Sequence, residues 1–280
     1  MALPLTDSAL IGTCLAASAL GLIVLTSSGG NGTAAPAESE TAMAQADILS
    51  QLGATAVDAD VTVDAEFGAK VRSYLLDNPE VIFEAVAVFE QRNASAQADM
   101  DAALLQANAD ALFNDGHSWV GGNPDGDVTL VEFLDYRCGF CKRASDEVAA
   151  LLETDGNIRR VVKEFPILGP DSELASRFAV SVLRLAGDDA YASVHDTLMQ
   201  HEGTFTPEYL DDLATSLELD FTAIVAEMES DDVTSILAEN RALAQRLQIS
   251  GTPTFVMETE MIRGFVDADV LIETAAALRD

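Results

Sequence analysis

Residues 128–141, VTLVEFLDYRCGFC, place a strand-like apolar run directly before two cysteines that are separated by two residues. A helix-like stretch, Lys142 to Leu152, follows them. Unpaired backbone N–H groups and the dipole at a helix N-terminus favour a thiolate, and the thiolate is the species that attacks a disulfide. A strand, a Cys-x-x-Cys and a helix in this order therefore predict a redox site, with Cys138 at the exposed helix end and Cys141 one turn inside.

The alternative for this motif is half of a zinc site, which needs two more cysteine or histidine ligands. The only other cysteine is Cys14, which lies in a distant apolar segment. The three histidines, His117, His195 and His201, also lack the spacing of a ligand pair. We therefore expect no metal and no cofactor.

Composition limits the partners. The chain has 280 residues, with 47 acidic and 15 basic side chains and a formal net charge of −32. This charge argues against nucleic acid or anionic lipid as a partner, since both are polyanions. The acidic residues are spread along the sequence, which is typical of the solvated surface of a salt-adapted protein.

Residues 9–25 form an apolar segment without a charged side chain, although no Lys or Arg precedes Lys70. Such a segment fits the core of a secretory signal or a short membrane anchor. We predict that residues 1–28 are a signal peptide or anchor and that residues 29–60, rich in Ser, Gly, Ala and Thr, are a flexible linker. If the segment is removed, the mature chain keeps only the two motif cysteines, which suits an oxidising compartment.

An N-terminal helical region is predicted over residues 61–111. Apolar side chains recur at helical spacing on both sides of a break at Asn78-Pro79: Phe67, Val71, Tyr74, Leu75, Ile82, Val86 and Phe89. A further helix is expected over 94–112. These helices are too thin to form a core alone, so their apolar faces must pack on the following domain or on other copies of the chain.

Residues 112–280 are predicted to form one α/β domain. Strands are expected at 115–120, 127–135, 158–165, 254–258 and 261–265, with a turn over 121–126. The sequence between about 171 and 247 is helical, and a final helix is expected over 267–278. This order predicts a small mixed sheet with an inserted helical subdomain.

Four features now combine. Glu132 stands six residues before Cys138; residues 135–142 read DYRCGFCK, residues 163–169 read KEFPILG, and residues 251–255 read GTPTF. Together they resemble the DsbA-like branch of the thioredoxin superfamily, and most of all the suppressor-of-copper-sensitivity protein C group, over about residues 65–280. The resemblance implies a thioredoxin-like fold with a helical insertion behind an N-terminal helical segment. It also implies a periplasmic protein-disulfide oxidoreductase or isomerase.

The resemblance assigns roles within the site. Cys138 is expected to attack and Cys141 to resolve, while Thr252-Pro253 is expected to be a cis peptide facing the disulfide, where Thr252 pairs with the client backbone. Glu132 is expected to be buried and to exchange protons with Cys141, since burial raises a carboxyl pKa. The alternative is that Glu132 lies on the solvent face of an alternating strand.

Neighbouring residues tune this chemistry. Gly139-Phe140 supplies no side-chain hydrogen-bond donor to the thiolate. The absence of such a donor favours a mild redox potential, and with it isomerase over oxidase activity. Alternatively, Phe140 could simply pack against a client. Lys142 and Arg143 form a local positive spot, although Arg143 is more simply interpreted as an ordinary exposed helix residue. Lys163 and Glu164 are interpreted as a polar strand end.

The expected partners are client proteins with cysteines, a membrane or periplasmic redox partner and, through the N-terminal helices, further copies of the chain. Two other functions stay open at this point. A reduced vicinal dithiol also binds Cu(I), which would suit a copper-tolerance system. An inert structural disulfide in a secreted scaffold is the third possibility.

Overall fold

The computed structural model describes residues 64–279, which belong to two structural units divided between Tyr74 and Leu75. The described part of the first unit is the beginning of helix α2 (Ala65–Asp77). The segments predicted as signal or anchor and as linker lie outside the described residues. Within residues 64–279, no helix is both long and apolar enough to cross a membrane.

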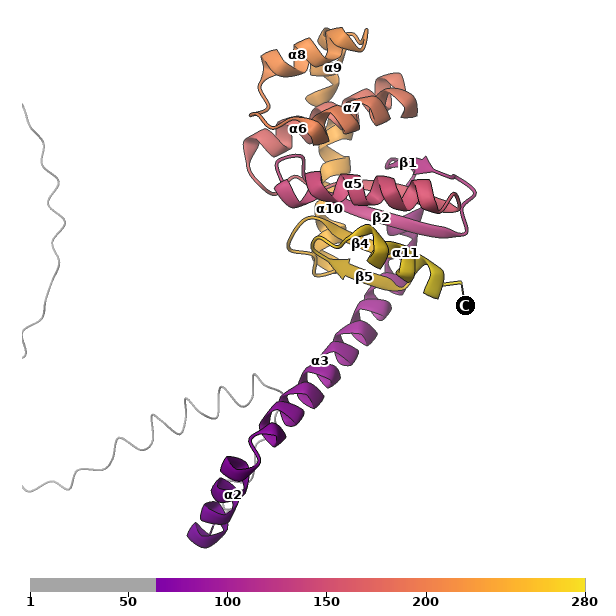
Figure 1. Cartoon of the computed structure of the whole chain (residues 1–280). Helices are drawn as coiled ribbons and strands as arrows, with labels where there is room; N and C mark the ends of the chain where they lie inside the picture. Colours follow the sequence, from indigo (N-terminus) through magenta and orange to yellow (C-terminus); the bar gives the residue numbers. More distant parts are fainter. Residues whose placement is uncertain (1–63, 280) are drawn as a thin grey trace, which may run out of the picture. The chain divides into compact units, whose positions relative to one another are not determined.

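The second unit holds a five-stranded sheet and the remaining helices (Figure 1). Its strands are β1 (Trp119–Gly122), β2 (Val128–Leu134), β3 (Ile158–Glu164), β4 (Thr254–Met257) and β5 (Glu260–Arg263). Its helices are α3 (Glu80–Ala107), α4 (Ala109–Phe113), α5 (Gly139–Thr154), α6 (Pro170–Ala186), α7 (Asp188–Gln200), α8 (Pro207–Ser216), α9 (Phe221–Met228), α10 (Asp231–Arg246) and α11 (Ala268–Ala277).

The sheet is mixed, as predicted, with the strand order β1-β3-β2-β4-β5. Strands β2 and β3 are parallel and every other neighbouring pair is antiparallel. Both central strands are buried along nearly their whole length. Burial on both faces explains the apolar run of β2, whereas β3 also buries the charged side chains of Arg160, Lys163 and Glu164. Helices α6 to α10 lie between β3 and β4 in the chain, so the thioredoxin-like fold carries the predicted helical insertion.

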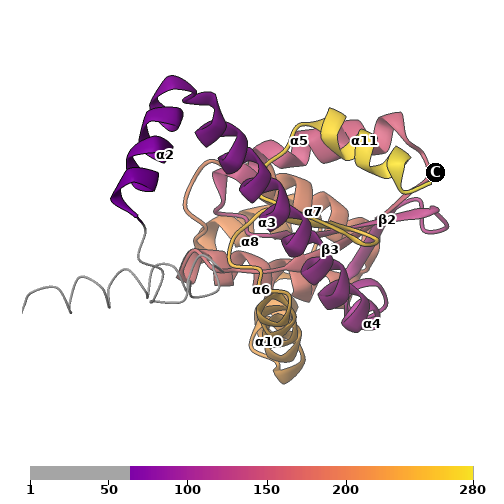
Figure 2. The ribbon, with the colours of Figure 1, turned by 90° about the horizontal axis from the view of Figure 1, so that it is seen from below.

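Helices cover both faces of the sheet. On one face α5 and α11 lie side by side and bury Val148, Leu151 and Leu271 against the strands (Figure 2). On the other face the end of α3, together with α4 and α10, buries Leu105 and Leu243. The N-terminal region therefore packs on the domain through the last turns of α3, which is one of the two outcomes expected for its apolar side chains.

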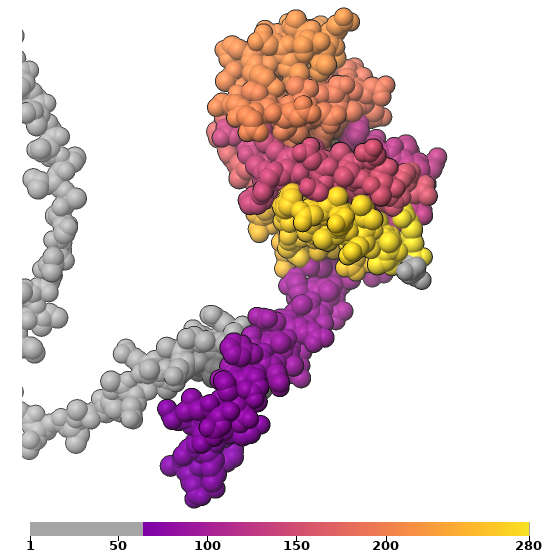
Figure 3. All heavy atoms as spheres, in the orientation of Figure 1, coloured from indigo at the N-terminus to yellow at the C-terminus, as the bar shows by residue number. Residues whose placement is uncertain are grey.

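The insertion builds a third core with the loop that carries the cysteines. Helices α6 to α9 form a lobe beside α5 (Figure 3). Phe178 and Leu198 from this lobe share one buried cluster with Tyr136, Cys138 and Cys141. The insertion thus forms part of the wall around the cysteine motif.

The largest differences from the sequence prediction concern the first strand and the helix predicted over 94–112. The first strand is Trp119–Gly122 rather than 115–120, because the Asp115 carboxylate accepts the backbone N–H groups of His117 and Ser118 and folds these residues into a turn. The helix predicted over 94–112 is the end of one long helix, α3, followed by the short α4. No Gly or Pro interrupts residues 80–107, so the helix continues through them.

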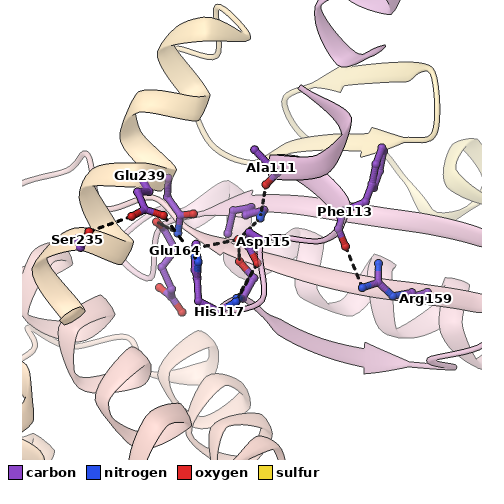
Figure 4. Close-up of polar contacts among 11 residues, drawn as sticks. Ala111, Phe113, Asp115, His117, Arg159, Glu164, Ser235 and Glu239 are labelled. Carbon is purple, nitrogen blue, oxygen red and sulfur yellow. Dashed lines mark hydrogen bonds and ion pairs between the residues drawn. The ribbon is translucent and has the colours of Figure 1, made fainter. Parts of the chain in front are cut away.

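Lys163 and Glu164 end strand β3, as predicted, but both side chains are buried rather than solvated. The Lys163 ammonium donates to the Ala111 carbonyl at 2.8 Å and pairs with Asp115. Burial lowers the Lys163 pKa, and the Asp115 carboxylate opposes that shift. Figure 4 shows Ala111 and Asp115 beside α10, where they cover this strand end. The lysine thus ties the segment before β1 to the central sheet.

Candidate active site

The two cysteines lie where β2 passes into α5. Cys138 is the N-cap residue of the helix, with φ −78° and ψ 112°, and its carbonyl accepts the Lys142 N–H at 3.1 Å. Its own N–H donates to the Asp135 carbonyl at 2.9 Å. Cys138 is 7% exposed, Cys141 is fully buried, and both are free thiols in this structure. Cys138 is therefore the cysteine that a partner can reach.

At the start of α5 the two cysteine thiols have pKa values that are shifted in opposite directions. The largest influence on Cys138 is a hydrogen bond from the Cys141 thiol, and the backbone N–H groups of Cys141 and Phe140 add further hydrogen bonds. Together these bonds lower the Cys138 pKa to about 5, although burial acts in the opposite direction. The same hydrogen bond and burial raise the Cys141 pKa well above its ordinary value. At neutral pH the pair therefore consists of one thiolate and one thiol, a combination suited to nucleophilic attack by the first sulfur.

The loop before β4 faces this thiolate. The Thr252–Pro253 peptide is cis, which confirms the predicted conformation. The Cys138 Sγ lies 3.2 Å from the Thr252 carbonyl oxygen. Thr252 is partly accessible while Pro253 is buried. The structure thus brings residues 252 and 253 to the cysteine that a partner can reach.

Glu132 is fully buried, which confirms the predicted burial and rejects the solvent-face alternative. Its Oε2 accepts from Arg160 Nη2 at 2.6 Å and from Arg160 Nε at 3.2 Å. Its Oε1 has no hydrogen-bond partner among the described residues. The Glu132 charge also contributes to the raised Cys141 pKa, so the two groups interact electrostatically.

A buried polar chain continues from Arg160. Arg160 Nη2 lies 3.1 Å from His195 Nε2, and His195 Nδ1 lies 3.1 Å from the Tyr136 hydroxyl. Because an arginine only donates, Nε2 accepts and Nδ1 carries the proton of the neutral imidazole. Burial, reinforced by the Arg160 charge, holds the His195 pKa well below its usual range. The chain therefore runs in one direction, from Arg160 through His195 to Tyr136.

Glu164 ends this chain. Its Oε1 accepts from Tyr136 at 2.7 Å and from Tyr191 at 2.6 Å, and its Oε2 accepts from Ser176 at 2.7 Å. Burial raises the Glu164 pKa to about 7 although these hydroxyl groups favour the charged form. Tyr136 stands two residues before Cys138, so the network fixes the segment that leads into the motif.

Asp135 joins this segment to the next loop. Its Oδ1 accepts from the Arg137 N–H at 2.8 Å and the Ser172 hydroxyl at 2.7 Å. Its Oδ2 accepts the N–H groups of Ile167 and Leu168 at 2.8 and 3.0 Å. One buried carboxylate therefore fixes both the approach to Cys138 and the loop over residues 166–169.

The surface around Cys138 carries exposed apolar side chains. Phe140 is 54% exposed, and Ile167 and Leu168 are also open to solvent. A Cβ added at Gly139 would meet no atom within 4 Å, so the first turn of α5 leaves open space beside the thiolate. Among residues 64–279 no cluster of three or more His, Cys, Asp or Glu side chains has an arrangement that could hold a metal ion.

Comparison with known proteins gives two domain matches. Residues 129–275 match the DSBA-like thioredoxin domain, and residues 64–96 match the copper resistance protein ScsC N-terminal domain. The first match covers more than half of the chain and contains both cysteines, the Thr252-Pro253 loop and the helical insertion.

Individual relatives agree with the domain match. A thioredoxin-like oxidoreductase from Silicibacter pomeroyi is 40% identical, with a TM-score of 0.58 over 61% of this chain and 98% of that one. The disulfide bond formation protein D of Bacillus subtilis is 26% identical over 55% of this chain and 73% of its own length. The Na(+)/H(+) antiporter NhaA 1 of Salinispora arenicola is 30% identical over 54% of this chain.

The chain spans only about a quarter of that antiporter's length, 23%, so the likeness is to one part of a larger protein. The DSBA-like domain match itself spans the cysteine motif, the inserted helices and four of the five strands, β2 to β5. Because the domain match spans more than half of the chain and includes both motif cysteines, the chain belongs to the DsbA-like thioredoxin family of thiol–disulfide oxidoreductases.

Proposed function

We propose that this protein exchanges and isomerises disulfides in client proteins through Cys138 and Cys141. The observation that carries the proposal is the split between the two sulfurs, with a thiolate at the accessible position and a thiol in the core. The Cys138 thiolate attacks a client disulfide, which forms a mixed disulfide and releases one client sulfur as a thiolate. When another client thiolate attacks the mixed disulfide, a new client disulfide forms and Cys138 leaves as the thiolate, with no net oxidation.

Escape from the mixed disulfide uses the second sulfur. The Cys141 thiol loses its proton and attacks Cys138, so that the Cys138–Cys141 disulfide forms and the client leaves reduced. Glu132 is the proposed proton acceptor, because its unpartnered Oε1 is buried and its charge interacts with Cys141. The protein is then oxidised and needs a reducing redox partner before it can isomerise again.

Client contact is proposed at the Thr252 backbone and at Gly139-Phe140. Thr252 is partly accessible beside Cys138, so its backbone can pair with an extended client segment. Phe140 offers an exposed ring next to the open space at Gly139. Unfolded clients expose apolar side chains, which is why an exposed ring suits them.

We also propose export to the periplasm and self-association, with the predicted boundaries of 1–28, 29–60, 61–111 and 112–280 as the domain division. The apolar segment over residues 9–25 supports export, either cleaved or retained as an anchor. On α3 the side chains of Ile82, Phe83, Val86 and Phe89 are all exposed, which supports association of copies through this helix.

The test is a pair of assays on the exported form of the chain. Reactivation of a scrambled, fully oxidised substrate measures isomerisation, and oxidation of the same substrate after reduction measures oxidase activity. We expect catalysed reactivation that is lost in Cys138→Ser, and a trapped client mixed disulfide in Cys141→Ser. Equal reactivation by wild type and Cys138→Ser would reject the proposal.

A second candidate is Cu(I) binding by the reduced dithiol, which the match to the copper resistance protein ScsC N-terminal domain favours. Two thiolates suit Cu(I) as soft ligands. Titration of the reduced protein with Cu(I) against a chelator distinguishes the two functions. Stoichiometric binding without any catalysed reactivation would favour the copper function.

A further inference from the structure

We propose that Arg143 binds a carboxylate of the client close to the cysteine under attack, so that clients with Asp or Glu beside that cysteine react faster. The proposal rests on the client exchange proposed above and names a feature of the preferred substrate. It also replaces the interpretation of Arg143 as an ordinary exposed helix residue.

Two aromatic rings hold the Arg143 guanidinium. Its Cζ lies 4.6 Å from the centroid of the Phe140 ring and 4.9 Å from that of Phe265. Phe140 belongs to the cysteine motif, and Phe265 lies in the loop between β5 and α11. Contact with two rings limits the rotation of a side chain that is otherwise mobile and exposed. Less conformational entropy is then lost when a ligand binds.

The N–H donors of the Arg143 guanidinium remain available to bind a ligand. In the described part of the chain most other guanidinium groups bind carboxylates, as Arg160 does with Glu132 and Arg263 with Asp101. Within residues 64–279, Arg143 forms no ion pair and no hydrogen bond, only the two ring contacts. A guanidinium offers its N–H donors as a planar fork that fits both oxygens of a carboxylate.

A groove leads from the motif past Arg143. It has a volume of about 420 Å³ and lies between α5 and the end of α7, where Gly139, Lys142 and Arg143 form part of its lining. In Figure 3, α5 lies on the surface beside the lobe of inserted helices. A client segment whose cysteine meets Cys138 can continue along this groove.

Charge in the groove selects one position for an acidic client side chain. The carboxylates of Asp146, Asp196 and Glu202 also line the groove, so most of it repels a client carboxylate. The Lys142 ammonium gives one of its three N–H donors to the His201 carbonyl and lies 5.9 Å from the centroid of the Phe205 ring. Of the two lining cations, Arg143 is therefore the one that keeps all of its donors for a ligand.

The expected preference is modest because the site is exposed. A solvent-exposed ion pair contributes at most about 1 kcal/mol, which corresponds to roughly a fivefold change in rate if the contact is present in the transition state. We expect a fully formed, ring-supported contact to approach this limit at low salt and to weaken at high salt.

The experiment uses the reduced full chain and a ten-residue peptide disulfide in three versions, with Glu, Gln or Lys two residues from the attacked cysteine. Quenched-flow mass spectrometry measures the rate of mixed-disulfide formation. Wild type should react about threefold to fivefold faster with the Glu peptide than with the Gln peptide. Arg143→Gln should remove this preference, and Arg143→Lys should keep only part of it.

The matched control is Arg92→Gln, which makes the same charge change at an exposed arginine of α3 outside the groove. It should keep the wild-type preference. Equal rates for the Glu and Gln peptides in wild type, or a Glu preference that survives Arg143→Gln, would overturn the inference while leaving client exchange intact. Exchange no faster than in Cys138→Ser with all three peptides would overturn both proposals.

Discussion

The buried carboxyl of Glu164 should make the stability of this protein depend on pH, and Glu164→Gln should remove that dependence. Glu164 is 3% exposed and accepts hydrogen bonds from Tyr136, Tyr191 and Ser176. A glutamine keeps an oxygen that accepts from both tyrosines, and its amide N–H can donate to the serine hydroxyl. The variant therefore keeps the shape and the contacts of the site but loses the titration.

The sign follows from the raised pKa. Burial raises the Glu164 pKa from 4.5 to about 7, so between these two pH values the folded state binds more protons than the unfolded state. The free energy of unfolding therefore falls as pH rises. The contribution from a neutral Glu164 is fully present below about pH 4.5 and is lost as pH rises through about 7.

The magnitude follows from the size of the shift. A difference of about 2.5 pKa units between the folded and unfolded states corresponds to about 3 kcal/mol. Relative to wild type, Glu164→Gln should thus become more stable by about 3 kcal/mol between pH 4.5 and pH 8. Other groups that titrate over this range, such as His195, cancel in the comparison of the two proteins.

The assay is urea unfolding of the reduced protein at several pH values between 4.5 and 8. Glu153→Gln is the control, since Glu153 is an exposed carboxyl on the same domain. This control should follow wild type at every pH. A constant difference between wild type and Glu164→Gln over the whole range would refute the reasoning, because Glu164 would then keep one protonation state.

Three further changes test the site and its surroundings. In denaturant titrations, Arg160→Met should lower the free energy of unfolding by about 3–5 kcal/mol, because it leaves the buried Glu132 charge unpaired. The double variant that also carries Glu132→Gln should recover much of this loss. Asp135→Asn should lower the free energy of unfolding by about 1–3 kcal/mol in the same titrations, since an amide nitrogen cannot accept the N–H groups that the Asp135 carboxylate binds. An unchanged unfolding midpoint would contradict the role given to this carboxylate. Deletion of residues up to Asp99 should leave a folded, redox-active monomer, because the packing of α3 on the domain begins at about Asp101; unchanged sedimentation would reject self-association through α2 and α3.

Much of the fold follows from local patterns in the sequence. The apolar run of β2, the Cys-x-x-Cys and the helical residues after it predict a strand, a redox site and α5 in the right order. The insertion is equally visible, because the periodicity from about residue 171 to 247 is helical throughout. The start of β1 was not predictable in this way, since the Asp115 side chain, rather than any apolar pattern, folds residues 115–118 into a turn.

The supporting groups of the site depend on contacts between distant segments. Glu132 and Arg160 meet because β2 and β3 are neighbours, and the sequence offers only the weak sign of an arginine inside an apolar strand. His195 comes from the inserted helix α7, so sequence reasoning considered it only as a metal ligand. Glu164 follows Lys163 and looks like part of a solvated strand end, although both are buried by segments that lie elsewhere in the chain.

The central claim is that the Cys138 thiolate is the attacking group. The most direct measurement is the rate of alkylation of the reduced protein as a function of pH, with peptide mapping to identify the modified cysteine. We expect Cys138 to be labelled well before Cys141, with a rate that rises through a midpoint near pH 5 and changes little above pH 7. A rate that continues to rise toward pH 9, or faster labelling of Cys141, would contradict the account.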